Sequence, residues 1–194
     1  MEGGPELNPT DQRRRREGLV FFLLFCLTVP AANWMIGHVG NACVPNGPCL
    51  IPVGFGLSAP SGVLMIGIAL VLRDLVQRRL GVHAAALAIL IGSVISAALA
   101  PPSLVIASAA AFFISEFVDL GVYTPLSRRS FLLAVLASGL VGLVVDSIVF
   151  LWFAFGSLQF LAGQIVGKAF MVVASLPFVA ALRRRDERLG LHAV

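Results

Sequence analysis

Two carboxylates, Glu116 and Asp119, lie three residues apart near the end of a long apolar run. At this spacing they share one face of a helix, and Tyr123 continues that face. A charge near the centre of a bilayer costs about 2.5–3.5 kcal/mol on insertion scales, so it rarely lies there without a partner or a function. Either both carboxylates reach the polar interface from the last turns of the helix, or they lie inside, where one is protonated or a donor lies between them.

Two further ionisable residues, Asp146 and Lys168, lie within the last two apolar runs. At 1.5 Å per residue, both fall in the outer to middle part of a bilayer. Consecutive antiparallel helices are usually neighbours, so a buried ion pair between them is expected. Such a pair either has a structural role alone or forms part of a ligand site. Gln164 precedes Lys168 by four residues and extends its polar face.

Three polar residues lie nearer the ends of the first two apolar runs. We expect Arg73 to extend to the membrane interface. The alternative is that Arg73 and Asp74 pair with each other or with Asp119, in a structural or gating role shared with Tyr123. Asn33 lies at the outer end of the first run, where capping a helix and contacting a ligand are equally compatible with its position.

The composition indicates an all-α integral membrane protein. Of 194 residues, 58% are hydrophobic and 12% are charged, whereas soluble proteins contain roughly 25% charged residues. The mean hydropathy is +0.95. We expect six transmembrane helices of roughly 20 residues each. The predicted helices cover residues 19–36, 58–76, 83–99, 103–123, 131–153 and 158–182. The chain then divides into a disordered basic cytoplasmic tail (1–17), a six-helix transmembrane transporter domain (18–183) and a cytoplasmic tail (184–194).

The arginines predict that both termini are cytoplasmic. The loops expected outside, at 37–57, 100–102 and 154–157, contain no Lys or Arg. Those expected inside contain Arg78, Arg79, Arg128, Arg129, Arg183, Arg184, Arg185 and Arg188. This asymmetry follows the positive-inside rule. The first outer loop also contains Cys43 and Cys49, for which a local disulfide and two free thiols both stay open.

The interior polar groups favour binding over catalysis. A few convergent polar groups in an apolar cavity are typical of a small-molecule site. No phosphate-binding loop, histidine-rich zinc signature or serine nucleophile elbow is present in the sequence. We therefore predict that the chain is not an enzyme and needs no cofactor or metal ion. The small residues that share the polar faces, such as Gly142, Gly163 and Gly167, are best interpreted as packing positions.

At these residues the chain resembles the VUT family, the queuosine-precursor transporters, which are six-helix bacterial membrane proteins. The resemblance extends from about Ala31 to Ala181 and depends on the order and spacing of several short motifs. These are Asn33, Asp74-Leu75 with Arg78 and Gly81, Ala107-Ser108, Ser115 to Asp119 leading to Val122-Tyr123, Ser138, Asp146-Ser147 with Phe150, and Lys168 with Pro177. The chain departs from the family at Ser103, where family members often have an arginine, and in the loop with two cysteines.

The resemblance implies import of 7-cyano- or 7-aminomethyl-7-deazaguanine across the cytoplasmic membrane of a bacterium. Glu116 and Asp146 are expected to read the guanine-like edge, with Asp119 as a second anion and Lys168 as donor or charge partner. Gln164 and Asn33 complete the expected substrate-binding set. An aromatic ring from Phe112, Phe150, Trp152 or Tyr123 is expected to stack on the base. The expected partners are this small molecule and the lipid bilayer, with a homodimer left open and no nucleic acid.

Two other functions stay open. Six helices with both termini inside also suit the substrate-binding subunit of an energy-coupling-factor vitamin importer. That function predicts a patch of small residues on the membrane face, which the Ala-rich helix at 83–99 would supply. A structural membrane protein would use the buried charges only to fix helix register. The transporter interpretation requires that Glu116, Asp146 and Lys168 meet around one polar chamber, and it fails if they point to different surfaces.

Overall fold

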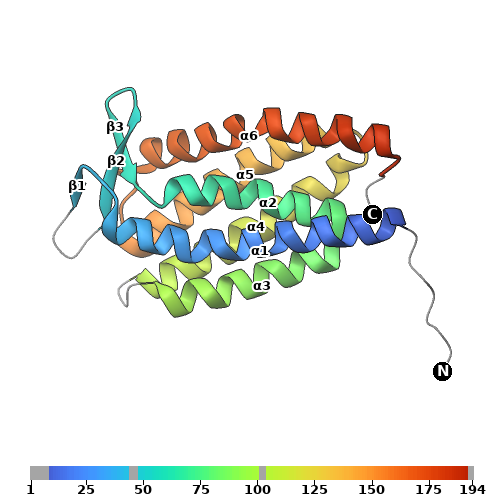
Figure 1. Ribbon diagram of the computed structural model, residues 1–194. Helices are drawn as coiled ribbons and strands as arrows, with labels where there is room; N and C mark the ends of the chain where they lie inside the picture. The colour runs from blue at the N-terminus through green and yellow to red at the C-terminus, as the bar shows by residue number, and fades with distance from the viewer. Residues whose placement is uncertain (1–8, 44–47, 101–103, 192–194) are drawn as a thin grey trace.

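The computed structural model describes residues 9–43, 48–100 and 104–191. Six helices run side by side along one axis, and a small sheet lies at one end of the bundle (Figure 1). The elements in chain order are α1 (Pro9–His38), β1 (Ala42–Cys43), β2 (Cys49–Gly54), β3 (Leu57–Pro60), α2 (Val63–Leu80), α3 (Val82–Leu99), α4 (Val105–Ser127), α5 (Phe131–Phe155) and α6 (Leu161–Leu189). The start of α1 and the end of α6 lie together at the opposite end from the strands.

Within the described ranges, five helices are long and apolar enough to cross a membrane, namely α1, α3, α4, α5 and α6. The sixth, α2, has the length but also four charged residues, Arg73, Asp74, Arg78 and Arg79. The composition therefore supports five of the six predicted spans. The exception, α2, can contain four charged residues because it contacts each of the other five helices. A helix enclosed by protein can contain charges that a lipid-facing helix cannot.

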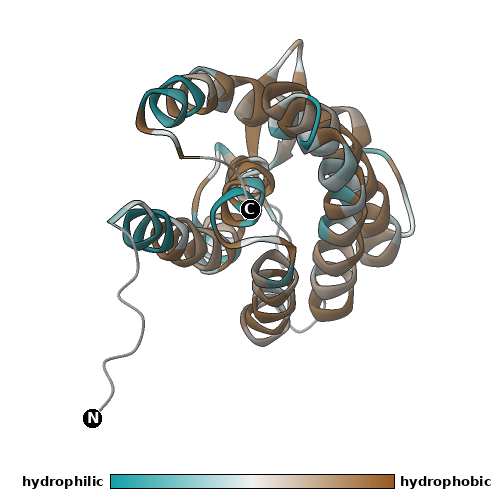
Figure 2. Cartoon of the chain, turned by 90° about the vertical axis from the view of Figure 1, so that its right-hand side faces the viewer, coloured by the Kyte–Doolittle hydropathy of each residue, from teal (hydrophilic) through white to brown (hydrophobic). Residues whose placement is uncertain are grey.

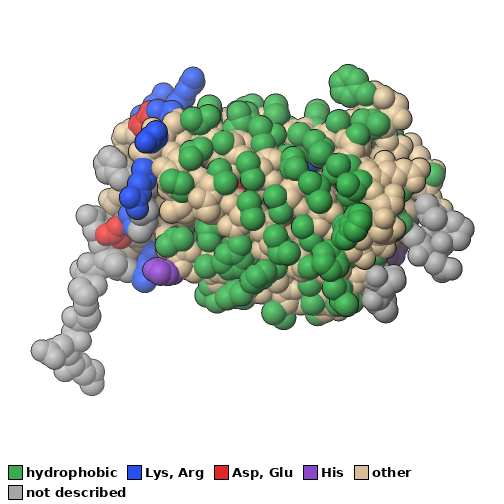
Figure 3. Space-filling view, turned by 180° about the vertical axis from the view of Figure 1, so that it is seen from behind, with side chains coloured by type: hydrophobic (Ala, Val, Ile, Leu, Met, Phe, Trp, Pro, Cys, Tyr) green, Lys and Arg blue, Asp and Glu red, His purple; other side chains and the backbone are tan. Residues whose placement is uncertain are grey.

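The apolar side chains divide between an interior core and an outer belt. Phe25, Leu70, Ile89 and Leu143 are among the buried core residues that join the helices. Many large apolar residues instead point outward, such as Ile106, which is 72% exposed. Figure 3 shows them as a continuous belt over one face, with the basic side chains gathered beyond one edge of it. A belt of this kind suits the hydrocarbon region of a bilayer.

Basic residues gather at one end of the bundle, here called the arginine-rich end. Figure 2 looks at this end and shows hydrophilic turns where α1 begins and α6 ends. The α2–α3 turn at Gly81 and the α4–α5 turn at Arg128 and Arg129 are also here, because successive helices alternate in direction. Helices α1, α3 and α5 end at the other end of the bundle, the strand end. This distribution agrees with the asymmetry of the loop charges.

The helices differ from the predicted ranges at their ends. Helix α1 begins at Pro9, so residues 9–17 are helical rather than part of a disordered tail, and residues 1–8 lie outside the described ranges. Proline suits the first turn of a helix, where its missing N–H costs no hydrogen bond. Helix α4 continues through Pro125 to Ser127, and α6 continues to Leu189. Both extend beyond their predicted ends, and α6 runs on into charged sequence.

The segment expected as a loop at 37–57 instead contains most of a three-stranded antiparallel sheet, with the order β1-β2-β3. Leu50 lies opposite Ala42 on one side and Pro60 on the other. A disulfide joins Cys43 to Cys49, so of the two open alternatives the structure has the bridge. Ser61 bonds the sheet to α1, because its hydroxyl donates to the carbonyl of Met35 at 2.6 Å. The fold is thus helical with one small sheet.

Candidate functional site

A cavity near the strand end is the best candidate for a ligand site, and we call it the strand-end cavity. All six helices and the last residue of β3 contribute to it. Its lining residues are Val29, Ala32, Asn33, Ile36, Pro60, Gly62, Val63, Ile66, Ser96, Ser108, Ala111, Phe112, Asp146, Phe150, Gln164 and Lys168. The centres of water molecules can occupy a volume of about 50 Å³ inside it. This is room for roughly three to five waters. A larger ligand requires the helices around it to separate.

The polar wall of this cavity is built on α5 and α6 around one ammonium group. Lys168 Nζ lies 2.5 Å from Asp146 Oδ2, 2.6 Å from Gln164 Oε1 and 2.9 Å from Ser147 Oγ. An ammonium group has three N–H donors, so each has an acceptor here. Asp146 Oδ1 also accepts a hydrogen bond from Ser115 Oγ at 3.4 Å. The predicted pair between Asp146 and Lys168 is therefore present, with their side chains almost fully buried.

Close backbone packing brings these two helices to the cavity. The start of α6 meets β3 at Gly163, where a Cβ atom would overlap the carbonyl oxygen of Ser58. At Gly167 a Cβ would lie 2.8 Å from Val63, and at Gly142 it would lie 3.1 Å from the Cβ of Asp119. These glycines act as packing positions, as the sequence suggested. Their absence of side chains lets the polar residues beside them face inward.

The apolar walls include two of the four predicted aromatic candidates. Phe112 of α4 and Phe150 of α5 both line the cavity. Trp152 points outward from α5 with 62% of its surface exposed, so it cannot stack on a ligand in this cavity. Tyr123 lies farther along α4 and packs on Arg73, whose guanidinium carbon is 5.5 Å from the ring centre. The cavity therefore offers Phe112 and Phe150 for a flat ring.

Asn33 reaches the cavity from α1 and is partly exposed within it. Its side-chain nitrogen donates to the carbonyl oxygen of Val29 at 3.0 Å, one turn back along the same helix. This bond fixes the side chain without capping a helix end. Of the two roles left open by the sequence, helix capping is not seen, and contact with a ligand stays a prediction for a residue that borders the cavity.

Four charged residues form a second buried cluster, the central ion network, consisting of Arg73 and Asp74 of α2 with Glu116 and Asp119 of α4. The guanidinium of Arg73 lies 2.9 Å from Asp74 Oδ1, 3.3 Å from Glu116 Oε2 and 2.6 Å from Asp119 Oδ2. The expectation that Arg73 extends to the interface is wrong, since its side chain is fully buried. Its stem runs among the other helices, and three carboxylates compensate its charge.

The prediction that Glu116, Asp146 and Lys168 meet in one chamber is correct for two of the three. Glu116 lies inside the bundle but does not line the strand-end cavity, because it is turned toward Arg73. Its neighbour Ser115 faces the other way and reaches Asp146. Consecutive residues of α4 thus connect the two buried polar groups. The three ionisable residues do not point to separate surfaces, so the condition that would end the transporter interpretation is not met.

Sequence reasoning missed several polar contributors. Ser115 and Ser147 were named only as parts of the family motifs and given no role, yet both bond to the Asp146–Lys168 pair. Gln77 accepts from Arg73 Nη1 at 3.3 Å and donates to Thr124 Oγ1 at 3.0 Å. Its position four residues after Arg73 was the available signal. Thr124 and Gln77 have no such pattern with each other, because they come from different helices.

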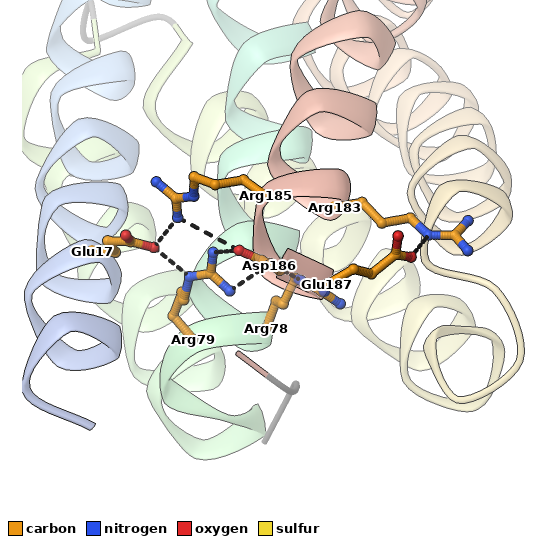
Figure 4. Close-up of polar contacts among 7 residues, drawn as sticks. All are labelled: Glu17, Arg78, Arg79, Arg183, Arg185, Asp186 and Glu187. Atoms are coloured by element: carbon orange, nitrogen blue, oxygen red, sulfur yellow. Dashed lines mark hydrogen bonds and ion pairs between the residues drawn. The ribbon is translucent and has the colours of Figure 1, made fainter. Parts of the chain in front are cut away.

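A third cluster closes the arginine-rich end, and we call it the arginine-end network (Figure 4). Asp186 of α6 accepts from Arg79 Nη1 and Nη2 at 2.9 and 2.7 Å and from Arg78 Nε at 3.1 Å. Glu17 of α1 accepts from Arg79 Nε at 2.9 Å and from Arg185 Nη2 at 2.5 Å. The network therefore joins α1, α2 and α6 at the end opposite the strand-end cavity.

Among the described residues, no group of three His, Cys, Asp or Glu side chains could hold a metal ion. The residues that line the cavity can form hydrogen bonds with a ligand and stack on its rings. Asp146 can accept from N–H groups, and Lys168 and the Gln164 amide can donate to a carbonyl. Phe112 and Phe150 can cover the faces of a ring.

A comparison with known protein families supports a transport role. Residues 96–182 match the family described as "Putative vitamin uptake transporter". The match contains Glu116, Asp119, Asp146, Gln164 and Lys168, whereas Asn33, Arg73 and Asp74 lie before it. It confirms the resemblance to the VUT family and indicates a multi-pass membrane transporter. Searches among curated proteins and among solved structures find no match.

Proposed function

We propose that this chain, which resembles the vitamin uptake transporters over residues 96–182, imports a queuosine precursor across the cytoplasmic membrane of a bacterium. The observation that carries the proposal is the strand-end cavity, where Asp146, Lys168 and Gln164 face two phenylalanines. A deazaguanine needs this combination. Its N–H and amino group donate side by side, its carbonyl accepts, and its rings are flat.

The charges in the cavity favour a neutral substrate. Asp146 and Lys168 compensate each other, and the carboxylates of Glu116 and Asp119 are engaged by Arg73 outside the cavity. A cationic ligand would therefore add an unpaired charge to a site of low polarity, which is costly. Of the two queuosine precursors, the 7-cyano form is neutral and the 7-aminomethyl form is cationic. We therefore favour 7-cyano-7-deazaguanine as the substrate.

In the proposed complex, Asp146 accepts from the guanine-like edge and Lys168 or Gln164 donates to the base carbonyl. One of the bonds between Asp146 and Lys168 or Ser115 must then be exchanged for a bond to the substrate. Such an exchange leaves every buried polar group satisfied, which limits its cost. A substrate lacking the edge donors would leave Asp146 unpaired, and that is the basis of selectivity.

We place all six helices across the membrane, with the arginine-rich end in the cytoplasm. Helix α2 has 18 residues, which is about 27 Å of helix, and it lies among five helices that are apolar enough to span. The positive-inside rule assigns the basic end to the cytoplasm. The disulfide at the strand end agrees with this orientation, because disulfides persist outside the cytoplasm. The strand-end cavity then faces the outside, from which a substrate is imported.

The energy-coupling-factor alternative loses its expected docking surface. The small residues Ala85, Ala88, Gly92 and Ser96 of α3 are buried against the bundle. The outward face instead presents larger residues such as Leu87 and Val94. The Ala-rich helix therefore uses its small side chains for packing within this chain. We retain the alternative only as an outcome of the transport test.

The decisive test measures ligand binding by purified protein. We expect 7-cyano-7-deazaguanine, but neither adenine nor biotin, to raise the thermal unfolding temperature, because a ligand of the native state stabilises it. Asp146→Asn and Gln164→Leu should abolish this shift. Trp152→Leu, on the lipid-facing side of the same helix as Asp146, is the matched control and should keep it. Stabilisation to the same extent by adenine, which lacks the base carbonyl and the N–H beside the amino group, would contradict the proposed substrate.

Uptake into liposomes containing only the purified chain separates the functions. A stand-alone transporter fills the liposomes with labelled substrate. A binding subunit of an energy-coupling-factor importer binds the substrate but does not transport it alone. A structural membrane protein shows neither saturable binding nor uptake.

A further inference from the structure

The central ion network contains more negative groups than positive ones. Asp74, Glu116 and Asp119 all lie within 3.3 Å of the single guanidinium of Arg73. Each of the four side chains is at most 2% exposed. If all four were ionised, two negative charges would stay uncompensated in the interior of the bundle. Buried charges without a partner cost several kcal/mol each, so protonation of at least one of the three carboxylates lowers this cost.

The hydrogen bonds show where that charge is needed. Within the described part of the chain, Asp119 Oδ1 is fully buried and has no hydrogen-bond donor. Ser138 lies near Asp119, but its hydroxyl donates to Asp74 Oδ2 at 3.3 Å. A serine hydroxyl has one proton and cannot serve both carboxylates. Asp119 Oδ2 therefore pairs with Arg73, whereas Oδ1 is a buried oxygen that could accept a proton.

Polar side chains connect this network with a cavity at the arginine-rich end. Arg73 Nη1 donates to Gln77, and Gln77 donates to Thr124. Gln77 and Thr124 both line this arginine-end cavity. Its other lining residues are Leu80, Gly81, Val82, His83, Ser127 and Arg128. Gln77 and Thr124 thus connect the network by hydrogen bonds with a cavity on the proposed cytoplasmic side.

The same network approaches the strand-end cavity on its other side. Glu116, bonded to Arg73, is adjacent to Ser115, which donates to Asp146 in the wall of that cavity. A change in the hydrogen bonds of Asp146 on substrate binding therefore reaches α4 within one residue of the network. The central ion network lies between the two cavities and contacts each through named side chains.

We propose that the central ion network is a proton-binding site, centred on Asp119, that couples substrate import to proton entry. This inference rests on the proposed transport function and adds its energy source. In each cycle one proton binds a carboxylate of the network while the network is accessible from the outside. The proton is released to water that reaches the network from the arginine-end cavity, on the side of Gln77 and Thr124. No covalent bond changes apart from this protonation.

A proton fits the site better than a metal ion. Asp119 lines neither cavity, so it has no access to a space for a hydrated ion there. No three carboxylates of the described residues could hold a metal ion. A proton needs neither a cavity nor a shell of oxygen ligands, and two carboxylates close together readily share one.

The charged and titratable groups around Asp119 come from four helices. They are Arg73, Asp74 and Arg78 of α2, Glu116 and Tyr123 of α4, Asp146 of α5, and Lys168 of α6, which is paired with Asp146. Only Arg73 among them is a cation in contact with the network carboxylates. Lys168 is already compensated by Asp146, so it does not supply the missing charge.

The experiment imposes a pH gradient on liposomes that contain the purified chain, with labelled 7-cyano-7-deazaguanine as the probe and the membrane potential clamped. With the outside one pH unit more acidic, one proton per neutral substrate supports accumulation up to about tenfold. We expect the wild type to approach this ratio. Asp119→Asn, which keeps the shape of the side chain, should still bind the probe but reach only equal concentrations. Glu187→Gln, on the exposed surface, is the control and should accumulate like the wild type.

The outcomes separate the two proposals. Wild-type uptake that ignores the gradient, or Asp119→Asn uptake that still follows it, overturns proton coupling and leaves transport intact. Absence of uptake under every gradient overturns the proposed function instead. Infrared spectroscopy then decides the proton site without substrate. The carbonyl band of a protonated carboxyl group should be present in the wild type at neutral pH and absent from Asp119→Asn. If Asp119→Asn does not fold, Glu116→Gln takes its place in transport, and absence of the band from the wild type overturns the site.

Discussion

Lys168 Nζ lies 2.5 Å from Asp146 Oδ2, and this pair joins α6 to α5 in the wall of the strand-end cavity. Lys168 is the only lysine of the chain, because the other 13 basic residues are arginines. An ammonium group is compact, and its three donors here meet two consecutive residues of α5 and one residue a turn back along α6. A guanidinium would need more space and more acceptors. The ion pair therefore specifies this residue type as well as its charge.

Removing one partner of the pair should cost more than removing both. Lys168→Met leaves Asp146 buried without a cation, and breaking a buried pair costs about 3–5 kcal/mol. The double change Lys168→Met with Asp146→Leu should recover much of that stability, because no unpaired charge is left. Neither variant should bind 7-cyano-7-deazaguanine. Thermal unfolding with and without ligand measures both effects. If the loss of stability in the double variant equals the sum of the losses in the two single variants, the two residues are not directly coupled.

The single lysine also permits a direct test of access to the cavity. A small amine-reactive reagent can modify only Lys168 and the terminal amino group. We expect slow modification of Lys168, because the side chain is 2% exposed. Substrate should slow it further by occupying the cavity. Mass spectrometry of the peptide containing Lys168 measures the rate, and a rate as fast as that of the terminal amine would contradict the buried position.

The arginine-end network should stabilise the bundle through Asp186. Asp186→Asn removes one of the two carboxylate charges that compensate Arg79, whose side chain is fully buried. We expect a loss of about 3–5 kcal/mol, as for other broken buried pairs. Glu187→Gln changes the next residue, whose ion pair with Arg183 is exposed, and should cost no more than about 1 kcal/mol. Chemical unfolding of the two variants compares them, and similar losses would show that burial is not the cause.

The sequence predicted which charges are buried better than it predicted their partners. Asp146 and Lys168 follow from depth along two consecutive helices, which are neighbours in most folds. The burial of Arg73 does not follow in this way, because its position near the helix end favours the membrane interface. Only the packing of the other helices around α2 shows that Arg73 lies away from lipid. Glu116 illustrates the same limit. Its face on α4 is readable from spacing, but its turn toward α2 rather than α5 depends on how three helices pack.

Local signals also explain the missed segments. Residues 9–17 are polar, so hydropathy gives no sign of the helix, and Glu17 finds its partners Arg79 and Arg185 far away in the sequence. The sheet was hidden by short strands in a segment rich in glycine and proline. The bend after β2 places Gly54, Phe55 and Gly56 at positive φ, a turn that glycine favours.

Close packing of α6 against the sheet gives a further prediction. Gly163→Val would place side-chain atoms where the Ser58 carbonyl lies, so the sheet or the helix must shift. Overpacking typically costs about 1–3 kcal/mol, and we expect loss of ligand binding as well. Gly37→Ala is the matched control, because nothing lies within 4 Å of the added Cβ. A neutral result at both positions would contradict the close approach of α6 to β3.

The disulfide should stabilise the strand end and report its side of the membrane. Replacing both Cys43 and Cys49 by serine should lower the unfolding temperature, and a reductant should lower it in the wild type only. In intact cells, a membrane-impermeant thiol reagent added after reduction should label the wild type at exposed Cys43. Labelling only after the cells are opened would reverse the proposed orientation.

The small sheet has a consequence for how the cavity admits its ligand. Its last strand passes into α2 through Ser61 and Gly62, whose backbone atoms bond to the sheet and to the first turn of the helix. The Cys43–Cys49 bridge joins β1 to β2 within the sheet, and the Ser61 bond to Met35 attaches the same unit to α1. The strands beside the cavity are therefore tied to α1 and α2 and do not form a loose flap. We expect the sheet and α2 to move together when a molecule the size of a nucleobase enters.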